Sequence, residues 1–399
     1  MRAARRLVAI IAALGGVVVA LGPAVGKPAA PRRPLAPPVV YLAVGADSLV
    51  AVGVADLAAG TFTPARGDLP LGVAQELAVD VASGRYALTF HQISGGDPLL
   101  VDGVARTTEL GPSVILVGTV GSDALTTMPG DPRCVSTKTA CFESVVRFEA
   151  GGAVLITQSL ASRWWMWNRR TVGAAARLRP IIDRKLARAA PPAVSATGDR
   201  AAYFAKDQLF VTAWPRQTAA KLAKVKPARK AVASPTMVMS APTMIGDRVY
   251  YFRREPVEQK VGMIAAFDLA TGAEELVYTL PEEFPLWDHR VLPDAARGTV
   301  LFQHDVQYER AEILEATPGS SAAPRVVARD VRELLDVSAD GTFILCSAFA
   351  EPDPTKRKDQ AQELVVIEVA TGTEVARRTV STPTSAHTTV YDARFAATP

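Results

Sequence analysis

The sequence predicts an all-β fold, and within that class a β-propeller of seven four-stranded blades. Two interleaved kinds of turn recur at a spacing of about 45–50 residues, which is the period of a four-stranded blade. Short runs rich in Val, Ile, Tyr and Phe separate the turns, as strands require. The 28 glycines and 29 prolines among 399 residues favour many turns over long helices.

The first kind of turn is a glycine followed by a short apolar or aromatic run. Its six copies begin at Gly84, Gly152, Gly198, Gly246, Gly298 and Gly341. The glycines are 68, 46, 48, 52 and 43 residues apart. The long first interval predicts an insertion near residues 100–150.

The second kind of turn joins two strand-like runs through a segment rich in Asp, Thr and Gly. It is clearest around Asp56, Asp268 and Glu368, and looser copies centre on Asp102, Asn168, Trp214 and Glu315. Seven such turns favour seven blades. Six or eight blades stay open, because the copies are degenerate.

The two ends of the repeat region predict how the ring closes. The first blade has strand-like runs at 39–44 and 49–54 with little before them, and a spare strand-like segment remains at 387–395. We expect this C-terminal segment to pair with the N-terminal blade, because an unpaired sheet edge invites aggregation. The clearest helical candidate is the segment 180–190, which begins with a proline.

Some of the turns resemble those of known exported propellers. The turn Ala266–Gly272 is similar to the blade motif Ala-x-Asp-x-x-Thr-Gly of quinone-type bacterial propellers, and the 368–372 turn is similar with Glu in the Asp position. Ser338–Gly341 is similar to turns of exported Tol-type and tryptophan–aspartate-like propellers. Leu276 stands where the quinone family has a docking Trp. The resemblance therefore implies an exported propeller, and we expect no cofactor.

The N-terminal segment predicts export. Three arginines precede an uncharged, largely apolar run from Leu7 to Gly26, so residues 1–26 are expected to be a cleaved signal peptide. An uncleaved membrane anchor is the alternative, because twenty residues can just span a bilayer. Residues 27–38 hold five prolines and form a linker. The propeller domain spans 39–399, and the protein is expected to be periplasmic or secreted.

The three cysteines fit this compartment. Cys134 and Cys141 lie close together in a turn-rich stretch, and in an oxidising compartment we expect them to form a disulfide. A zinc site would need two further ligands that the nearby sequence lacks. Cys346 lies in an apolar run and is expected to be a buried small hydrophobic residue.

Residues that could carry catalysis are few. The sequence has no G-x-S-x-G nucleophile motif. His91 and His304 occupy matching places after first-kind strands, where a histidine can bind a metal or act as a base. A polar residue that simply ends a strand is the plainer interpretation. No metal site is therefore predicted.

Three tryptophans lie within four residues, at Trp164, Trp165 and Trp167. They suggest either a stacking platform for a sugar or peptide, or packing between blades. Strand alternation places Trp165 and Trp167 on one face. Packing is the expected role.

The charge distribution is the most informative signal for function. The segment 163–230 contains sixteen basic and three acidic residues, a net charge of +13, whereas the whole chain has +4. The repeat alignment places part of this charge at the outermost strands of consecutive blades. The predicted patch for an anionic partner comprises Arg177, Arg179, Lys221, Lys224 and Lys226. Anionic polymers, lipid head groups or an acidic protein face would be attracted, and nucleic acid is not expected after export.

These observations predict a noncatalytic exported binding module for an envelope protein or for an anionic surface or polymer. The alternative is a hydrolase or lyase with its site in the central channel, using rim carboxylates such as Asp305, Glu309 or Asp353. The sequence does not show whether any two of these carboxylates lie close together in space. A third possibility is a spacer tethered to the membrane through residues 7–26.

Overall fold

The computed structural model describes the propeller region in segments. The described residues are 36–45, 50–66, 72–93, 110–122, 124–130, 142–161, 164–174, 179–180, 192–195, 197–205, 208–215, 217–218, 220–221, 230–232, 242–254, 261–283, 291–307, 310–351, 353, 361–380 and 388–396. All of their regular structure is β-strand. Among these residues there is no helix of the length and apolar character needed to cross a membrane.

The strands form seven antiparallel sheets, which we number as blades 1 to 7. Blade 1 has the order β27 (Thr388–Phe395), β1 (Val39–Gly45), β2 (Val50–Asp56), β3 (Thr61–Arg66). Blade 2 has β4 (Gly72–Asp80), β5 (Arg85–Ile93), β6 (Leu110–Thr119), β7 (Thr126–Pro129), and blade 3 has β8 (Phe142–Glu149), β9 (Val154–Ala161), β10 (Trp164–Thr171), β11 (Arg179–Pro180).

The remaining blades follow the same order. Blade 4 has β12 (Ala193–Val194), β13 (Arg200–Ala205), β14 (Gln208–Ala213), and blade 5 has β15 (Thr243–Ile245), β16 (Arg248–Arg254), β17 (Val261–Asp268), β18 (Glu274–Glu283). Blade 6 has β19 (Val291–Asp294), β20 (Thr299–Gln307), β21 (Arg310–Ala316), β22 (Arg325–Val331), and blade 7 has β23 (Glu333–Val337), β24 (Phe343–Phe349), β25 (Gln362–Glu368), β26 (Thr373–Thr379).

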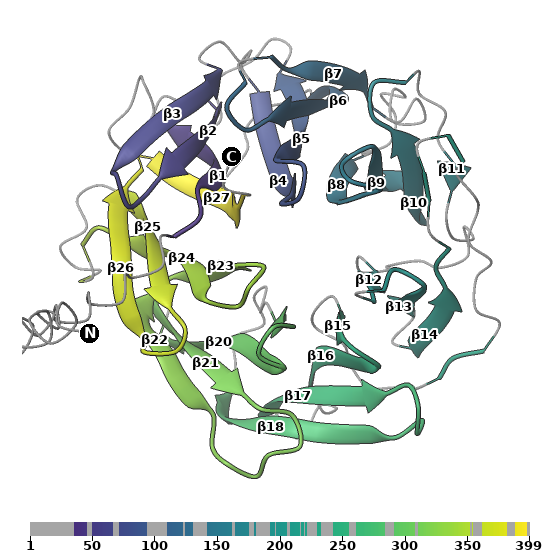
Figure 1. The fold of residues 1–399 in the computed structure, drawn as a ribbon, viewed down its shortest axis with the longest axis vertical. Helices are drawn as coiled ribbons and strands as arrows, with labels where there is room; N and C mark the ends of the chain where they lie inside the picture. Colours follow the sequence, from purple (N-terminus) through teal and green to yellow (C-terminus); the bar gives the residue numbers. More distant parts are fainter. Residues whose placement is uncertain are drawn as a thin grey trace, which may run out of the picture. The chain divides into compact units, whose positions relative to one another are not determined.

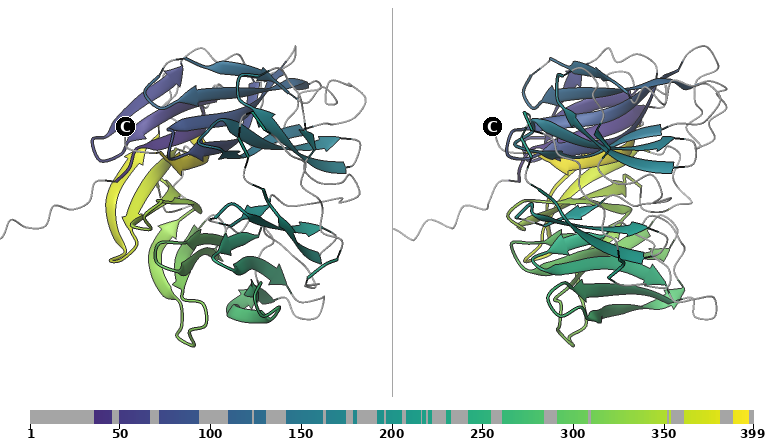
Figure 2. Two further views of the ribbon diagram at one scale, coloured as in Figure 1. Left: turned by 45° about the vertical axis from the view of Figure 1, so that its right-hand side comes forward. Right: turned by 90° about the vertical axis from the view of Figure 1, so that its right-hand side faces the viewer.

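The blades follow one another around a ring, with the first strand of each blade innermost and the last outermost (Figure 1). The side views show that the faces of successive blades pack against one another (Figure 2). The predicted seven-bladed propeller is therefore confirmed. Six blades have four strands and blade 4 has three strands among the described residues.

The C-terminal strand closes the ring as predicted. β27 pairs antiparallel with β1, in a register that joins Val39 to Phe395 and Gly45 to Thr388, and the two strands lie side by side in Figure 1. Val390 and Phe395 of β27 also belong to the apolar core shared with blade 7. Blade 1 is thus built from both ends of the repeat region. The edge of β1 that would otherwise be open is paired with β27.

The first-kind glycines all lie in turns between the first and second strands of blades. Their φ values run from +56° at Gly246 to +79° at Gly152, a left-handed region that costs other residues energy. The second-kind turns at Asp56, Asp268 and Glu368 lie between third and fourth strands. Local backbone chemistry therefore marks both turns of the blade.

Two of the looser second-kind copies do not centre on a described turn. Asp102 lies outside the described residues, and the turn between the third and fourth strands of that blade follows β6 at residues 120–125. Asn168 lies inside β10, where it is buried and donates to Ser159 Oγ at 2.9 Å. Short Asp- or Asn-containing patterns mimic a turn locally, whereas strand pairing decides where the turn falls.

Three predictions fall wholly or largely outside the described residues. The predicted disulfide, Cys134–Cys141, belongs to the connection 130–141 between β7 and β8. The helix predicted at 180–190 overlaps the described chain only at Pro180, which ends β11. Both stay predictions, as does the signal peptide.

Apolar clusters fill the spaces between neighbouring blades. Cys346 is fully buried in the cluster between blades 6 and 7, as predicted, and burial raises the pKa of its thiol. Trp167 packs with Tyr203 and Trp214 between blades 3 and 4, edge-on to Tyr203 at 5.5 Å between ring centres. The packing role is thus confirmed for Trp167.

The innermost strands of blades 7, 1, 2 and 3 each contain a β-bulge. The extra residues are Leu335, Tyr391, Glu76 and Val146. Because an innermost strand is the edge of its sheet, some of its N–H groups have no ladder partner, and burying them unpaired is costly. These blades therefore need acceptors from outside their own sheet.

The preceding blade supplies an acceptor beside each bulge, and we call these four contacts the bulge clamps. The donor–acceptor pairs are Leu334 N to Gln303 Oε1 at 3.1 Å, Val390 N to Gln362 Oε1 at 3.0 Å, Leu77 N to Asp392 Oδ2 at 3.3 Å, and Val145 N to Thr89 Oγ1 at 3.0 Å. The clamps link blades 6, 7, 1, 2 and 3 in sequence.

Replacing Thr89 with Val keeps the side-chain shape but removes the acceptor for Val145 N–H. An unpaired buried donor costs about 1–3 kcal/mol, so we expect Thr89→Val to lower the free energy of unfolding by that amount in denaturant titrations. Thr126→Val, at an exposed position of β7, is the control and should change little. Equal effects of the two substitutions would contradict the clamp.

Gly341 is predicted to be less replaceable than Gly298. Both have φ near +68°, so Ala costs roughly 1–2 kcal/mol at either site. A Cβ at Gly341 would also clash with the Asp294 carboxylate of blade 6, whereas a Cβ at Gly298 meets nothing within 4 Å. Thermal unfolding should show Gly341→Ala to be clearly more destabilising than Gly298→Ala, and a smaller loss at Gly341 would reject the inter-blade contact.

Candidate functional site

The two rims of the ring differ in their connections. Antiparallel order places the first-to-second and third-to-fourth turns on one rim, the turn rim, and all other connections on the opposite connection rim. Turns on the turn rim span from two residues (246–247) to eight (317–324). The strand ends on the connection rim are joined by longer segments, including 94–109 and 130–141. Binding residues on rigid scaffolds usually lie on such longer connections.

The predicted histidines lie on equivalent strands. His91 is on β5 of blade 2 and His304 on β20 of blade 6, each near the end that leads to the connection rim. His304 is half-buried and lies opposite Glu312 in the strand register. Blades 7 and 1 lie between the two histidines. The two residues therefore belong to different parts of the ring.

The predicted rim carboxylates take part in local contacts. Asp305 accepts a hydrogen bond at 2.6 Å from Gln303, whose amide oxygen forms a bulge clamp with Leu334. Asp305 therefore supports the contact between blades 6 and 7. Asp353 N donates to Glu351 Oε1 at 3.0 Å. Glu309 lies outside the described residues.

An ion chain on the innermost strands joins blades 7, 1 and 2. Arg394 Nη2 donates to Asp392 Oδ2 at 3.0 Å, and Arg394 Nη1 lies 4.0 Å from Asp336 Oδ1 while also donating to Leu335 O. Asp336 Oδ2 in turn accepts from Phe395 N at 2.8 Å. Burial raises the pKa of Asp336, although the charge of Arg394 opposes this. No sequence motif pointed to this cluster.

Two bulge residues beside this ion chain are exposed. Tyr391 has 51% of its surface exposed, and Glu76, with φ +48°, is exposed too. Both lie in the middle of innermost strands whose faces are covered by neighbouring blades. Their exposure therefore opens toward the ring axis. Bulges commonly re-aim side chains near functional sites, and sequence alternation alone does not reveal them.

Blade 3 buries two of the sixteen basic residues that the sequence assigned to a basic region, Arg169 and Arg170. Arg170 Nη1 donates to Glu143 Oε1 at 2.9 Å, with both side chains at most 2% exposed, and Thr157 Oγ1 donates to the same oxygen at 2.8 Å. Arg169 Nε lies 3.5 Å from Glu149 Oε2 and is also fully buried. The net charge of residues 163–230 therefore overstates the charge at the surface.

Two residues of the predicted anionic-partner patch belong to the described residues. Arg179 is on β11, the outermost strand of blade 3, opposite Arg169 of β10. Lys221 is exposed and pairs with Thr218 in an isolated bridge that follows β14 of blade 4. Arg177, Lys224 and Lys226 lie outside the described residues.

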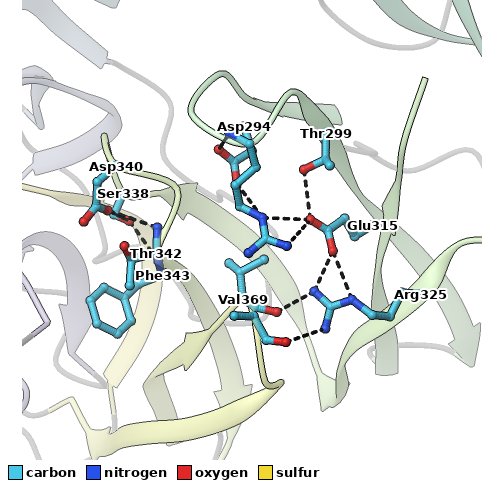
Figure 3. Close-up of polar contacts among 11 residues, drawn as sticks. Asp294, Thr299, Glu315, Arg325, Ser338, Asp340, Thr342, Phe343 and Val369 are labelled. Carbon is cyan, nitrogen blue, oxygen red and sulfur yellow. Dashed lines mark hydrogen bonds and ion pairs between the residues drawn. The ribbon is translucent and has the colours of Figure 1, made fainter. Parts of the chain in front are cut away.

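The 368–372 turn, one of the two that resemble turns of quinone-type propellers, has a packing role. Arg325 of blade 6 donates to Glu315 Oε2 and, across the blade boundary, to the carbonyl oxygens of Val369 (2.5 Å) and Ala370 (3.3 Å) in the turn of blade 7 (Figure 3). Thr299 Oγ1 donates to Glu315 Oε1 at 2.9 Å. The turn therefore docks one blade on the next.

The Ser338–Gly341 turn is held by its own side chains. Ser338 Oγ donates to Asp340 Oδ1 at 2.7 Å and accepts from Phe343 N at 2.9 Å (Figure 3). Thr342 N donates to the same Asp340 oxygen at 3.0 Å. These contacts shape the turn and leave no sign of chemistry beyond it.

No protein-family profile and no curated protein sequence matches this chain. Solved structures do resemble it. A puromycin hydrolase S511A mutant complexed with PGG has a TM-score of 0.57 at 16% identity, covering 88% of this chain and 54% of the hydrolase. A putative 6-phosphogluconolactonase from Bacteroides fragilis NCTC 9343 has 0.50 at 11% identity, covering 92% and 100%.

TolB from Acinetobacter baumannii has a TM-score of 0.48 at 8% identity, covering 90% of this chain and 67% of TolB. The chain spans about half the length of the puromycin hydrolase. At such low identities the similarity shows the fold alone, and this fold is shared with hydrolases.

Glu315 should make stability depend on pH. Burial acts to raise its pKa, but hydrogen bonds from Arg325 and Thr299 and the charges of Arg297 and Arg325 outweigh burial and hold that pKa below its ordinary value of 4.5. A lowered pKa stabilises the fold above the unfolded pKa, and this contribution is lost as pH falls through the folded pKa.

We therefore expect Glu315→Gln to be less stable than wild type by about 1–3 kcal/mol at pH 7, with a gap that narrows below about pH 4. Urea titrations at several pH values measure this gap. Glu374→Gln, which alters an exposed ion pair with Arg377, is the control and should have little effect at any pH. A gap for Glu315→Gln that does not narrow in acid would contradict the assignment.

Proposed function

We propose that this chain is a noncatalytic, exported binding module that holds an envelope protein, or an anionic surface or polymer, at the basic outer edge of blades 3 and 4. The observation that carries the proposal is the position of Arg179 on the outermost strand of blade 3 and of exposed Lys221 in the next blade. The edges of these two blades are neighbours on the outside of the ring (Figure 1). Arg177, Lys224 and Lys226 complete the proposed patch.

The structure of the ring suits this role. The bulge clamps and the hydrogen bonds from Arg325 to Val369 O and Ala370 O hold blades in fixed relative positions, so a partner would meet a preorganised surface and lose less free energy to ordering. Basic residues at such an edge also attract an anionic partner from a distance.

Export is part of the proposal. Residues 1–26 would be removed as a signal peptide, which gives a periplasmic or secreted protein with a Cys134–Cys141 disulfide. An uncleaved 7–26 segment would instead tether the module to a membrane. Sequencing the N-terminus of the mature protein distinguishes the two, and thiol labelling before and after reduction tests the disulfide.

A hydrolase or lyase acting near the ring axis is the second candidate. The observation that favours it is the pair of exposed bulge residues, Tyr391 and Glu76, next to the Asp336–Arg394–Asp392 ion chain. The resemblance in fold to puromycin hydrolase is compatible with this candidate. A hydrolase of this kind would lose activity on Glu76→Gln, whereas binding at the outer edge would be unchanged.

The binding proposal is tested with the full chain on heparin and on vesicles containing phosphatidylglycerol. Each basic residue near an anionic surface contributes roughly 1 kcal/mol, so Arg179→Gln with Lys221→Gln should weaken vesicle binding about 30-fold and lower the salt needed for elution from heparin.

The control pair is Arg310→Gln with Arg329→Gln, which makes the same charge change at exposed positions of blade 6. This pair should leave both readouts close to wild type. Absence of wild-type retention at low salt, or equal losses in the two double variants, would reject the proposed patch.

A further inference from the structure

The face of blade 3 that packs on blade 4 contains more positive than negative charge. In the strand registers Arg147 of β8 lies opposite Ile156 of β9, and Ile156 lies opposite Arg169 of β10. The two arginines thus share one row on one face of the sheet. Glu149 lies two residues beyond Arg147, in the next row. Among the side chains that the structure describes, two guanidinium groups and one carboxylate therefore share this face, and Arg179 of β11 continues the row opposite Arg169.

Glu149 is already engaged by Arg169 and Trp214. Arg169 Nε is 3.5 Å from Glu149 Oε2, and Trp214 Nε1 of blade 4 donates to Glu149 Oε1 at 2.5 Å. The Trp214 ring also stacks on the Arg169 guanidinium, 4.6 Å from its centre. These three side chains form a unit that bridges blades 3 and 4.

Arg147 is outside this unit. Within the described part of the chain its Nε is buried without a hydrogen-bond acceptor, and so is Trp167 Nε1 on the same face. Burial lowers the pKa of Arg147, and the charge of Glu149 opposes this. The residue keeps some exposed surface, and it lies on an innermost strand. A cation in this position is costly unless an anion compensates it.

The opposite face of blade 3 provides the comparison. There Arg170 and Glu143 form a one-to-one pair at 2.9 Å, and Arg170 also donates to Pro129 O of blade 2. The charge of Arg170 is therefore paired within the fold, although its Nε, like that of Arg147, is buried without a hydrogen-bond partner in the described part of the chain. The face toward blade 4 has the same kind of buried arginine and one guanidinium in excess.

We infer that Arg147 binds the carboxylate or phosphate group of a small organic anion between blades 3 and 4. The planar guanidinium fork matches both groups and forms strong charge-assisted hydrogen bonds with them. Trp167 Nε1 offers a further donor on the same face. The excess positive charge disfavours a metal cation. This site is distinct from the outer edge of blades 3 and 4, and it stands independently of the function proposed above.

Thermal unfolding of the full chain tests this inference. Sodium phosphate and sodium acetate are the two probes, each compared with sodium chloride at matched ionic strength. Wild type should show a saturable rise in Tm with at least one probe, and the probe with the larger rise identifies the preferred group. A wild-type Tm that follows ionic strength alone would overturn the site.

Substitutions separate binding from stability. Arg147→Met should raise Tm in chloride, because it removes an uncompensated buried charge, and should abolish the anion response. Arg169→Met should lower Tm, because it leaves Glu149 and Trp214 without their shared partner. Arg147→Lys keeps the charge without the fork and should bind the probe at least tenfold more weakly than wild type.

The outer-edge double variant, Arg179→Gln with Lys221→Gln, is the matched control and should keep the full anion response. An Arg147→Met protein that retains the response would overturn the assignment. If the outer-edge variant loses the response while Arg147→Met keeps it, the anion binds at the outer edge, and the inference is wrong while the proposed function stands.

Discussion

The unpaired edge of each innermost strand is the constraint on which this ring depends. A strand with a neighbour on both sides can satisfy its N–H groups within the sheet. The innermost strand has a partner on one side only. In blades 7, 1, 2 and 3 the preceding blade supplies the missing acceptor, from Gln303, Gln362, Asp392 and Thr89. These buried polar residues hold each blade to the next in a defined register.

The clamps divide the ring into two parts. Blades 7, 1, 2 and 3 have innermost strands of five to nine residues with bulges, whereas β12, β15 and β19 of blades 4, 5 and 6 have two to four residues and pair with their second strands without a register shift. The junction between blades 3 and 4 is where the clamped part ends. Aromatic packing and the Arg169–Glu149–Trp214 unit join the blades at this point.

Three arginines help to hold neighbouring blades together. Arg170, Arg325 and Arg394 each link a carboxylate with a backbone carbonyl of another blade. Positive charge without a carboxylate partner is the physical basis for the outer-edge patch and for the anion site at Arg147. Such charge gains free energy when an anionic ligand binds. One site is inside, at Arg147, and the other is at the outer edge.

The sequence by itself determined the period, the glycine turns and the closing strand, because each depends on local chemistry. A glycine at positive φ, such as Gly298, and an alternating strand at 388–395 are readable without knowing their neighbours. Only the tertiary structure decided which polar residues are clamps and which arginines are buried. The clamp partners come from another blade, 28 to 315 residues away along the chain. Arg170 is paired with Glu143 on a different strand of its own blade, so a charge count cannot distinguish Arg170, which is buried, from Lys221, which is exposed.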